Sequence, residues 1–309
     1  MASQSSGIGG VVRPQDALTY LHLSLATLFW AGVFVAGKIA LEVVDPIFLA
    51  TARFVVAALA VGVVVLFARG FAARTLREIA TFAWIGFLGV FAYNIAFTIA
   101  LDWSSPLHGL VIIATTPAWT ALLAVPLLGA RVTRAQVAGF ALAFAAVLLI
   151  VLVEGEGEAS DFTRASLSGD LLFVAAAIVW ALYTIESRKA LARTNAATLT
   201  GWSLVLGALM LVPVALVFSD VPVMAAAMRP FDWAAVLYMG VFATLGAFLL
   251  WSKGVAAIGP ARAAVFLNLV PIWGAILTAL AFLAAPPVHV LAAMALAIAG
   301  VVAVQRGGR

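Results

Sequence analysis

Long apolar runs alternate with short polar connections along nearly the whole chain. A transmembrane helix needs about 20 mostly apolar residues. Runs of that length predict ten spans, at residues 18–40, 46–68, 79–101, 106–128, 134–153, 168–190, 197–219, 232–256, 260–283 and 288–305. The connections are short, so the pattern predicts an all-α integral membrane protein of ten transmembrane helices without a separate soluble domain.

The composition agrees with a membrane location. Of the 309 residues, 65% are hydrophobic and 10% are charged, whereas a soluble domain has roughly 45–50% apolar and about 25% charged residues. The bilayer is therefore the expected solvent. Residues 1–17 are polar and lack the apolar core of a signal peptide, so we expect a flexible cytoplasmic N-terminus followed by a retained first helix.

The charges predict the orientation of the spans. With a cytoplasmic N-terminus, most of the 17 Lys and Arg residues fall on the inner side, which is the side where basic residues accumulate. The segment 154–167, which contains the acidic run EGEGEASD, then lies in the periplasm. Both termini, including the tail 306–309, are therefore expected in the cytoplasm.

Internal similarity indicates two copies of one unit. The segment ATLFWAGVFVAGKIAL (26–41) aligns with AAIVWALYTIESRKAL (176–191), PLHGLVIIATTPAWTA (106–121) with PARAAVFLNLVPIWGA (260–275), and AGFALAFAAV (138–147) with AAMALAIAGV (292–301). The predicted repeats are five-helix units at 18–153 and 168–305. Because five is odd, the second copy is inverted in the membrane, an architecture typical of transporters with a central substrate site.

These features resemble a known family. Two five-helix repeats, a tryptophan in the first helix of each, Arg53 in the TARF segment and P-x-W in each fourth helix are similar to the drug/metabolite transporter superfamily and, within it, the EamA family. Ser203 stands at the repeat counterpart of Arg53, which departs from the pattern. The resemblance implies an exporter of small metabolites in the bacterial inner membrane, with amino-acid exporters of the YddG type as the expected relatives.

Aromatic and polar residues in mid-span are the candidates for the substrate site. Buried indole N–H groups and amides need hydrogen-bond partners that hydrocarbon does not offer, and polar groups inside membranes usually face the bundle interior or a wet cavity. The expected substrate-binding residues are Trp30, Tyr93, Asn94, Trp119, Trp180, Tyr183, Asn268 and Trp273. The alternatives are packing for the tryptophans and interhelical hydrogen bonds for the asparagines.

The two fourth helices carry a proline at equivalent places. Pro117 and Pro271 each remove one helical hydrogen bond and free a carbonyl four residues earlier, at Ile113 and Leu267. We expect them to act as paired hinges, with static kinks as the alternative. The hydroxyls of the neighbouring Thr115 and Thr116 are expected to bond to the backbone of their own helix.

Two basic residues are expected at the outer half of the first repeat. A charge at the depth of Arg53 needs a partner or a function, and Glu42, Asp45 and Asp102 lie at a suitable depth for a gate ion pair. Direct substrate binding by Arg53 is the alternative. Lys38 belongs to the same predicted gate, or extends its amine to the membrane surface.

Other functional classes find little support. No Asp or Glu lies at mid-depth, Glu186 is near an inner helix end, and the three histidines, His22, His108 and His289, fall near span ends, so a carboxylate-centred proton exchange is not supported. There is no Walker loop and no cofactor is expected. The chain lacks the motifs of integral membrane enzymes. A channel stays an alternative.

The expected cavity is aromatic and nearly uncharged, which suits an aromatic or apolar amino acid, or an organic cation or drug held by cation–π contacts. Expected partners are the substrate and the lipid bilayer, without nucleic acid. Small residues at 139–146 and 293–300 indicate close helix packing, in a monomer or a homodimer.

Overall fold

The computed structural model describes residues 14–68, 75–128, parts of 133–149, 164–258, 263, 265–282 and 287–307. Within these ranges the regular elements are helices. Most of the expected flexible N-terminus and of the acidic segment 154–167 lies outside the described residues.

The first half of the chain forms four long helical segments. They are α1 (Pro14–Ala40), α2 (Pro46–Ala68), a rod made of α3 (Leu76–Gly86), η1 (Phe87–Ala92) and α4 (Tyr93–Trp103), and the interrupted pair α5 (Pro106–Ile113) and α6 (Thr116–Leu128). Polar caps set several of these boundaries. The Asp45 carboxylate accepts from the N–H groups of Ile47 and Phe48 at the start of α2, and Thr75 forms a capping box with Glu78 at the start of α3.

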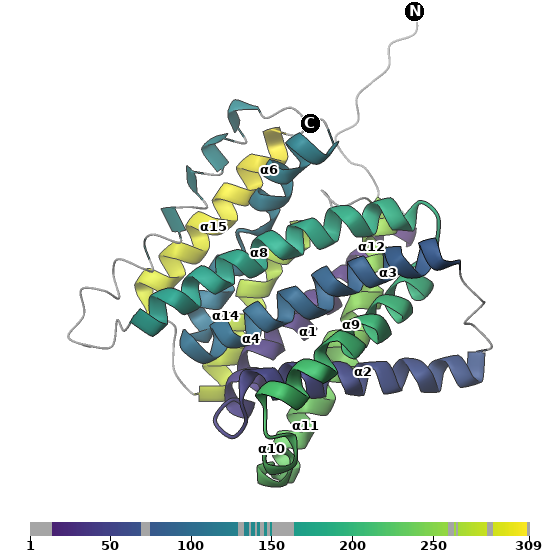
Figure 1. The fold of residues 1–309 in the computed structure, drawn as a ribbon. Helices are drawn as coiled ribbons and strands as arrows, with labels where there is room; N and C mark the ends of the chain where they lie inside the picture. Colours follow the sequence, from purple (N-terminus) through teal and green to yellow (C-terminus); the bar gives the residue numbers. More distant parts are fainter. Residues whose placement is uncertain are drawn as a thin grey trace, which may run out of the picture.

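The second half repeats this order. It contains α8 (Arg164–Leu191), α9 (Ala196–Phe218), the short α10 (Val221–Ala227), a rod of α11 (Pro230–Tyr238), η2 (Met239–Gly246) and α12 (Ala247–Ile258), the pair η3 (Val265–Asn268) and α14 (Leu269–Phe282), and α15 (Val288–Gly307). The two halves pack into each other: α8 lies along α4, α2 along α9, and α1 along α12 and α14 (Figure 1).

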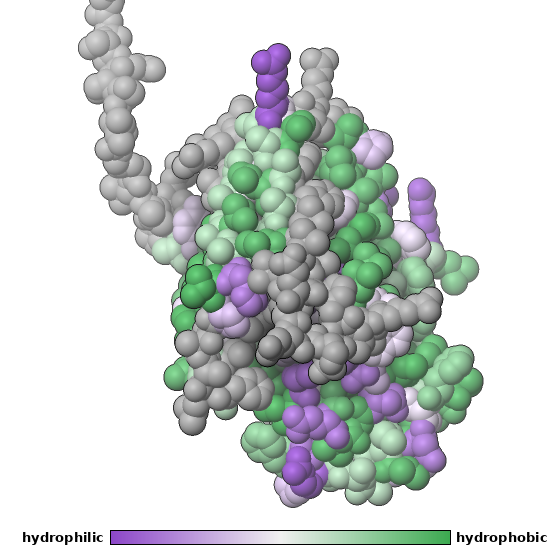
Figure 2. Space-filling model, turned by 90° about the vertical axis from the view of Figure 1, so that its left-hand side faces the viewer, coloured by the Kyte–Doolittle hydropathy of each residue, from purple (hydrophilic) through white to green (hydrophobic). Residues whose placement is uncertain are grey.

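Seven described helical segments are long and apolar enough to cross a membrane. They coincide with seven of the predicted spans, and α2 has the predicted limits, 46–68. Shorter apolar helices lie at Ile272–Ala281 and Val288–Gly300, within the ninth and tenth predicted spans. The predicted fifth span, 134–153, is described only in part, so the count of ten stays a prediction. Hydrophobic residues predominate on the coloured part of the face in Figure 2.

Both third helices change to π-helical geometry at corresponding places, in η1 and in η2. The sequence GVFA occurs in each, at 89–92 and at 240–243. A π-helical turn disturbs the regular backbone ladder and is frequent at functional sites. Here side chains bond to its carbonyls: Asn94 Nδ2 donates to Gly89 O at 2.9 Å and Val90 O at 3.0 Å.

The glycines of these two segments admit a neighbouring helix. A Cβ on Gly89 would lie 2.5 Å from the Tyr183 ring, and a Cβ on Gly240 would lie 2.8 Å from the Arg53 carbonyl oxygen. These distances are shorter than any ordinary contact of a Cβ atom. The glycines of the two GVFA segments therefore allow close contact between the third helix of each half and a helix of the other half.

The fourth helices are interrupted close to their prolines. α5 ends at Ile113 and α6 begins at Thr116, so Pro117 stands in the first turn of a new helix, where its missing N–H costs little. The hydroxyls of Thr115 and Thr116 donate to Ile112 O and Ile113 O, each at 2.6 Å, which confirms their expected bonding to their own helix. In the second half, a 3₁₀ segment (η3) precedes α14, whose third residue is Pro271.

Candidate functional site

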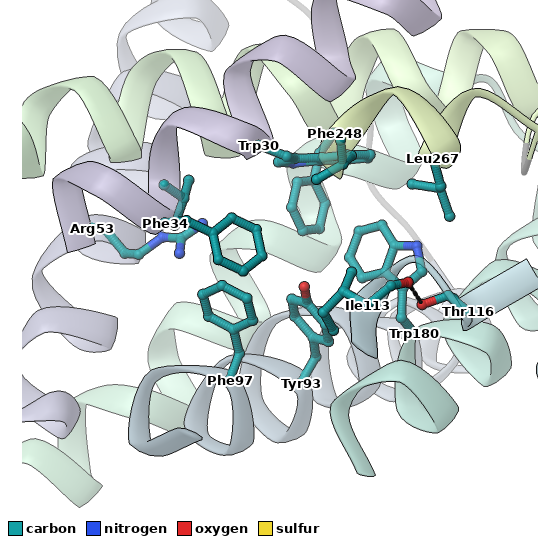
Figure 3. Close-up of a pocket in the computed structure, with 12 residues that line it drawn as sticks. Trp30, Phe34, Arg53, Tyr93, Phe97, Ile113, Thr116, Trp180, Phe248 and Leu267 are labelled. Atoms are coloured by element: carbon teal, nitrogen blue, oxygen red, sulfur yellow. Dashed lines mark hydrogen bonds between the residues drawn. The ribbon is translucent and has the colours of Figure 1, made fainter. Parts of the chain in front are cut away.

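A pocket lies between the two halves of the bundle, where α1, α4, α5, α8 and α12 meet (Figure 3). Its volume is about 40 Å³, which is room for about three water molecules. In this conformation the pocket is too small for an amino acid. Its lining consists of Trp30, Val33, Phe34, Arg53, Tyr93, Phe97, Ile113, Thr116, Trp180, Phe248, Leu267 and Val270.

Aromatic rings from both halves form the walls of the pocket. Trp30 and Trp180, the repeat-related tryptophans, meet edge to face with centroids 5.2 Å apart. The ring centroid of Trp180 lies 4.9 Å from that of Tyr93 and 5.4 Å from that of Phe248. Edge-to-face packing fixes the ring orientations, and Trp30 Nε1 is further held by donation to Ala243 O in η2 at 3.0 Å. These walls are therefore mainly aromatic, with the orientation of Trp30 set by a hydrogen bond.

Arg53 supplies a charge at one end of this aromatic pocket (Figure 3). Its side chain is 5% exposed, and its Nε and Nη2 donate to Thr244 Oγ1 at 3.3 and 3.1 Å. The Phe54 ring lies 5.0 Å from its guanidinium carbon. Among the residues that the structure describes, no acid forms an ion pair with Arg53.

In the described part of the structure Arg53 forms none of the ion pairs that its depth suggested, so its role as a gate residue stays a prediction. Asp45 caps α2 and accepts from Ser219 Oγ at 2.8 Å, and Glu42 is exposed. The Lys38 amine donates to the carbonyls of Leu101 at 3.2 Å and Asp102 at 3.4 Å. Lys38 thus stabilises the C-terminal end of α4, where cations are favoured, and Arg53 bonds across to the second half instead.

Besides the Arg53 guanidinium, two neutral polar groups belong to residues that line the pocket. The Tyr93 hydroxyl points into the pocket (Figure 3). Trp180 is 5% exposed, and its Nε1 has no hydrogen-bond partner among the described residues. A buried indole N–H normally has an acceptor. This atom has almost no accessible surface here, so a ligand or water reaches it only when the pocket widens.

The remaining predicted site residues lie outside the pocket lining. Asn94 is buried against its own π-helix, and Tyr183 is buried behind Trp180, with ring centroids 4.8 Å apart. Trp119 donates to Thr115 Oγ1 at 3.1 Å, and Trp273 is partly buried. The side chain of Asn268 is outside the described part of the chain.

Several lining residues carried no polar or periodic signal in the sequence. Phe34, Phe97 and Phe248 are ordinary apolar residues of apolar helices. Phe248 nevertheless follows the second GVFA segment closely, and Tyr93 follows the first directly. The repeated GVFA segments were the available signal for this part of the pocket.

Comparison with known proteins identifies the family. The model of the EamA-like transporter family matches residues 17–152 and residues 167–305. The chain belongs to this family. The resemblance noted from the sequence is confirmed, and the protein is a membrane transporter of the EamA type.

Relatives at moderate identity carry transporter names. YyaM of Bacillus subtilis, described as an uncharacterized transporter, is 30% identical over 255 residues, covering 82% of this chain and 82% of that protein. A probable terminal-alkyne amino-acid exporter of Streptantibioticus cattleyicolor is 27% identical and covers 92% of both chains. The aromatic amino acid exporter YddG of Ancylobacter novellus is 27% identical, covering 89% of this chain and 92% of that one.

A known crystal structure has the same fold. It superimposes with a TM-score of 0.68 at 23% identity, covering 93% of this chain and 97% of the other. The names of the family and of the relatives indicate transport rather than enzymatic catalysis.

Proposed function

We propose that this EamA-type transporter exports amino acids with aromatic or other apolar side chains from the cytoplasm, by alternating access through the pocket between its two halves. The observation that carries this proposal is the place of Arg53. It is a buried cation at the end of an aromatic pocket, and a neutral hydroxyl is its recorded hydrogen-bond partner.

Arg53 has the chemistry to hold a carboxylate. A buried charge inside a membrane is costly and marks a functional site unless it is paired. Arg has five N–H donors, and two of its hydrogen bonds go to Thr244, which leaves about three (5 − 2) N–H groups for a ligand. A planar fork with two free donors matches a carboxylate.

The aromatic walls fit the rest of such a substrate. Trp30, Trp180 and Phe248 offer flat apolar surfaces for its side chain. The ring faces also attract an α-ammonium group through cation–π contacts, and the Tyr93 hydroxyl accepts a hydrogen bond. An organic cation without a carboxylate is disfavoured, because the Arg53 charge repels it in a medium of low dielectric. Amino acids therefore fit this pocket better than cationic drugs.

Alternating access is supported by the relation between the halves. The family model matches each half separately, and the interruptions of the third and fourth helices occur at corresponding places in both. Inverted repeats transport by exchanging the conformations of the halves around a central site. The closed pocket of about 40 Å³ must widen to admit a substrate, and the breaks beside Pro117 and Pro271 are the places where helices bend most easily. The charge bias supports cytoplasmic termini, and the bacterial relatives support a location in the bacterial inner membrane.

Counterflow in proteoliposomes tests the proposal. Vesicles that contain the purified protein are loaded with one unlabelled amino acid and diluted into the radiolabelled one, in a panel of aromatic, aliphatic and charged amino acids, arylalkylamines and quaternary ammonium compounds. We expect saturable counterflow for aromatic or large apolar amino acids. Counterflow of the quaternary ammonium compounds in the absence of any amino-acid signal would replace the proposal by drug export.

A further inference from the structure

A second buried polar cluster lies where the beginning of α8 meets the connection between α4 and α5, at the lower left of Figure 1. It consists of Ser104, His108 and Asp170, which are 7%, 1% and 2% exposed. Ser104 Oγ donates to Asp170 Oδ1 at 2.5 Å, and His108 Nδ1 lies 3.1 Å from both carboxylate oxygens. The His108 imidazole and the Asp170 carboxylate are thus brought together from the two halves of the chain.

A layer of three phenylalanines separates this cluster from the pocket. The rings of Phe34, Phe97 and Phe173 lie with centroids 5.2 to 6.5 Å apart. Phe34 and Phe97 also line the pocket, while Phe173 follows Asp170 by one helical turn on α8. A Cβ on Gly109, beside His108, would lie 2.5 Å from Phe173 and 2.8 Å from Phe34. The ring layer and the cluster together close the pocket toward this end of the bundle.

The helices touch directly at the cluster. A Cβ on Gly169 would lie 2.8 Å from Ser104 Cβ and 3.0 Å from Ser104 N, so α8 rests on the backbone of the α4–α5 connection. Opening the pocket toward this side requires α8 and this connection to separate. That movement takes Asp170 away from His108 and Ser104 and admits water.

The charge of the cluster depends on one proton. With a neutral imidazole, the cluster buries an ionised carboxylate beside two neutral groups, and an uncompensated buried charge is costly. With a protonated imidazole, it buries a hydrogen-bonded ion pair, and removing one partner of such a pair is strongly destabilising. The closed arrangement therefore binds a proton more tightly than the open one, in which Asp170 and His108 are solvated separately.

The other charged groups at this end do not replace that proton. On the helices packed against α5 and the first turns of α8, the described ones are Lys38 on α1, Asp102 on α4 and His289 on α15. Arg164 begins α8, and its side chain lies outside the described part of the chain. The Lys38 amine lies 3.5 Å from the Ser104 carbonyl oxygen and bonds to backbone carbonyls rather than to Asp170. Asp102 is exposed, so its charge is screened by solvent.

We propose that Ser104, His108 and Asp170 form a proton-binding site that closes the outer side of the transporter. A proton from the outer water adds to the His108 imidazole, forming one N–H bond, and the resulting imidazolium holds Asp170 of α8 against the α4–α5 connection. The proton returns to water when the outer side opens. The proposal rests on the proposed function only in requiring that the pocket opens outward. Because the bound proton favours closing of the outer side, the step from the empty outward-open state to the inward-open state is faster in acid surroundings.

The direction of the pH effect follows from the binding preference. Because the closed state holds the proton more tightly, its extra stability is present at low external pH and is lost as the external pH rises. A proton bound tenfold more tightly in the closed state shifts the ratio of open to closed molecules by up to about tenfold across the titration range of histidine. The outward-open population therefore increases as the external pH rises.

Accessibility of a pocket cysteine measures this population without any substrate. The chain has no native cysteine, so Val33→Cys in the pocket is labelled from outside with a membrane-impermeant maleimide at external pH values from 5.5 to 8, with the internal pH held constant. Labelling of Val223→Cys, an exposed position on α10, at the same pH corrects for the intrinsic reactivity of the thiol. We expect the corrected Val33→Cys labelling rate to rise about three- to tenfold with pH. A flat profile in this otherwise native chain overturns the proposal.

Histidine variants then assign the effect. The sequence contains three histidines. In the double variant His22→Gln/His289→Gln, His108 is the one that remains, and the cluster is intact. It is expected to keep the pH profile, and losing the profile would assign the proton to another histidine. His108→Gln keeps a hydrogen-bond donor for Asp170 but does not titrate, and is expected to flatten the profile. A pH-dependent profile in folded His108→Gln overturns the assignment. Neither result bears on which substrate is carried, because no substrate is present.

Discussion

Removing the charge of Arg53 is the perturbation that separates amino-acid export from other functions of this pocket. Arg53→Gln keeps a polar side chain able to bond to Thr244 but loses the charge and the fork. A hydrogen bond to a charged group contributes about 1.5–3 kcal/mol, and two such bonds to a substrate carboxylate are partly offset by desolvation. We therefore expect amino-acid affinity to fall by about 2–4 kcal/mol, which is about 30- to 900-fold. Arg53→Lys keeps the charge but loses the planar fork, so its amino-acid affinity should lie between those of the wild type and Arg53→Gln.

The assay uses a matched pair of ligands. Binding of an aromatic amino acid and of the arylalkylamine that lacks only its carboxylate is measured on detergent-purified protein by calorimetry. The wild-type protein should prefer the amino acid, and Arg53→Gln should lose that preference by weakening the amino acid and sparing or improving the amine. Arg193→Gln, the same change at an exposed arginine after α8, is the control and should match the wild type. Unchanged amino-acid affinity and an unchanged preference in folded Arg53→Gln would refute the role of Arg53.

Three further perturbations follow from the structure. Trp180→Ala and Tyr93→Ala should reduce counterflow at least tenfold with little change in thermal stability in detergent. Trp119 lies outside the pocket lining, so Trp119→Ala should reduce counterflow less. Equal effects of all three variants, accompanied by unfolding, would indicate packing roles. Pro117→Ala and Pro271→Ala restore a backbone donor, so turnover should fall more than affinity in each, and unaltered turnover would make the prolines static kinks. For the topology, Val223→Cys should react with an impermeant maleimide in intact cells and Arg193→Cys only after permeabilisation; the reverse pattern would invert the orientation.

The positions of helices along the chain were predictable because a run of about 20 apolar residues marks a segment that crosses the membrane. The predicted span 46–68 is α2, and the segments at 79–101 and 232–256 lie within the rods Leu76–Trp103 and Pro230–Ile258. The interruptions near Pro117 and Pro271 followed from the missing N–H of proline. These features depend on local sequence and on the lipid solvent.

The direction in which a side chain points was not predictable in the same way. Trp30, Trp119, Trp180 and Trp273 have similar depth, yet Trp30 and Trp180 line the pocket and the other two do not. A membrane helix is apolar on all sides, so its sequence gives weak information about which face meets another helix. Trp251, which no pattern singled out, lies buried 5.3 Å from Trp30.

Contacts between distant segments were missed for a related reason. His108 and Asp170 lie 62 positions apart, each near the end of a predicted span, and only the docking of α8 on the α4–α5 connection joins them. The π-helices were missed because their sequences have the same apolar character as an α-helix, although the repeated GVFA segments marked their place.

Alternating access through the aromatic pocket is the central claim, and labelling of a single pocket cysteine from both sides of the membrane tests it most directly. Val33→Cys lies in the pocket lining, in a chain with no other cysteine. In oriented vesicles, an impermeant maleimide added to either side should label it, since the pocket opens alternately to each. A saturating aromatic amino acid should protect it from both sides, and the corresponding amine should not. Labelling from one side only, or labelling that the amino acid does not affect, would contradict the account.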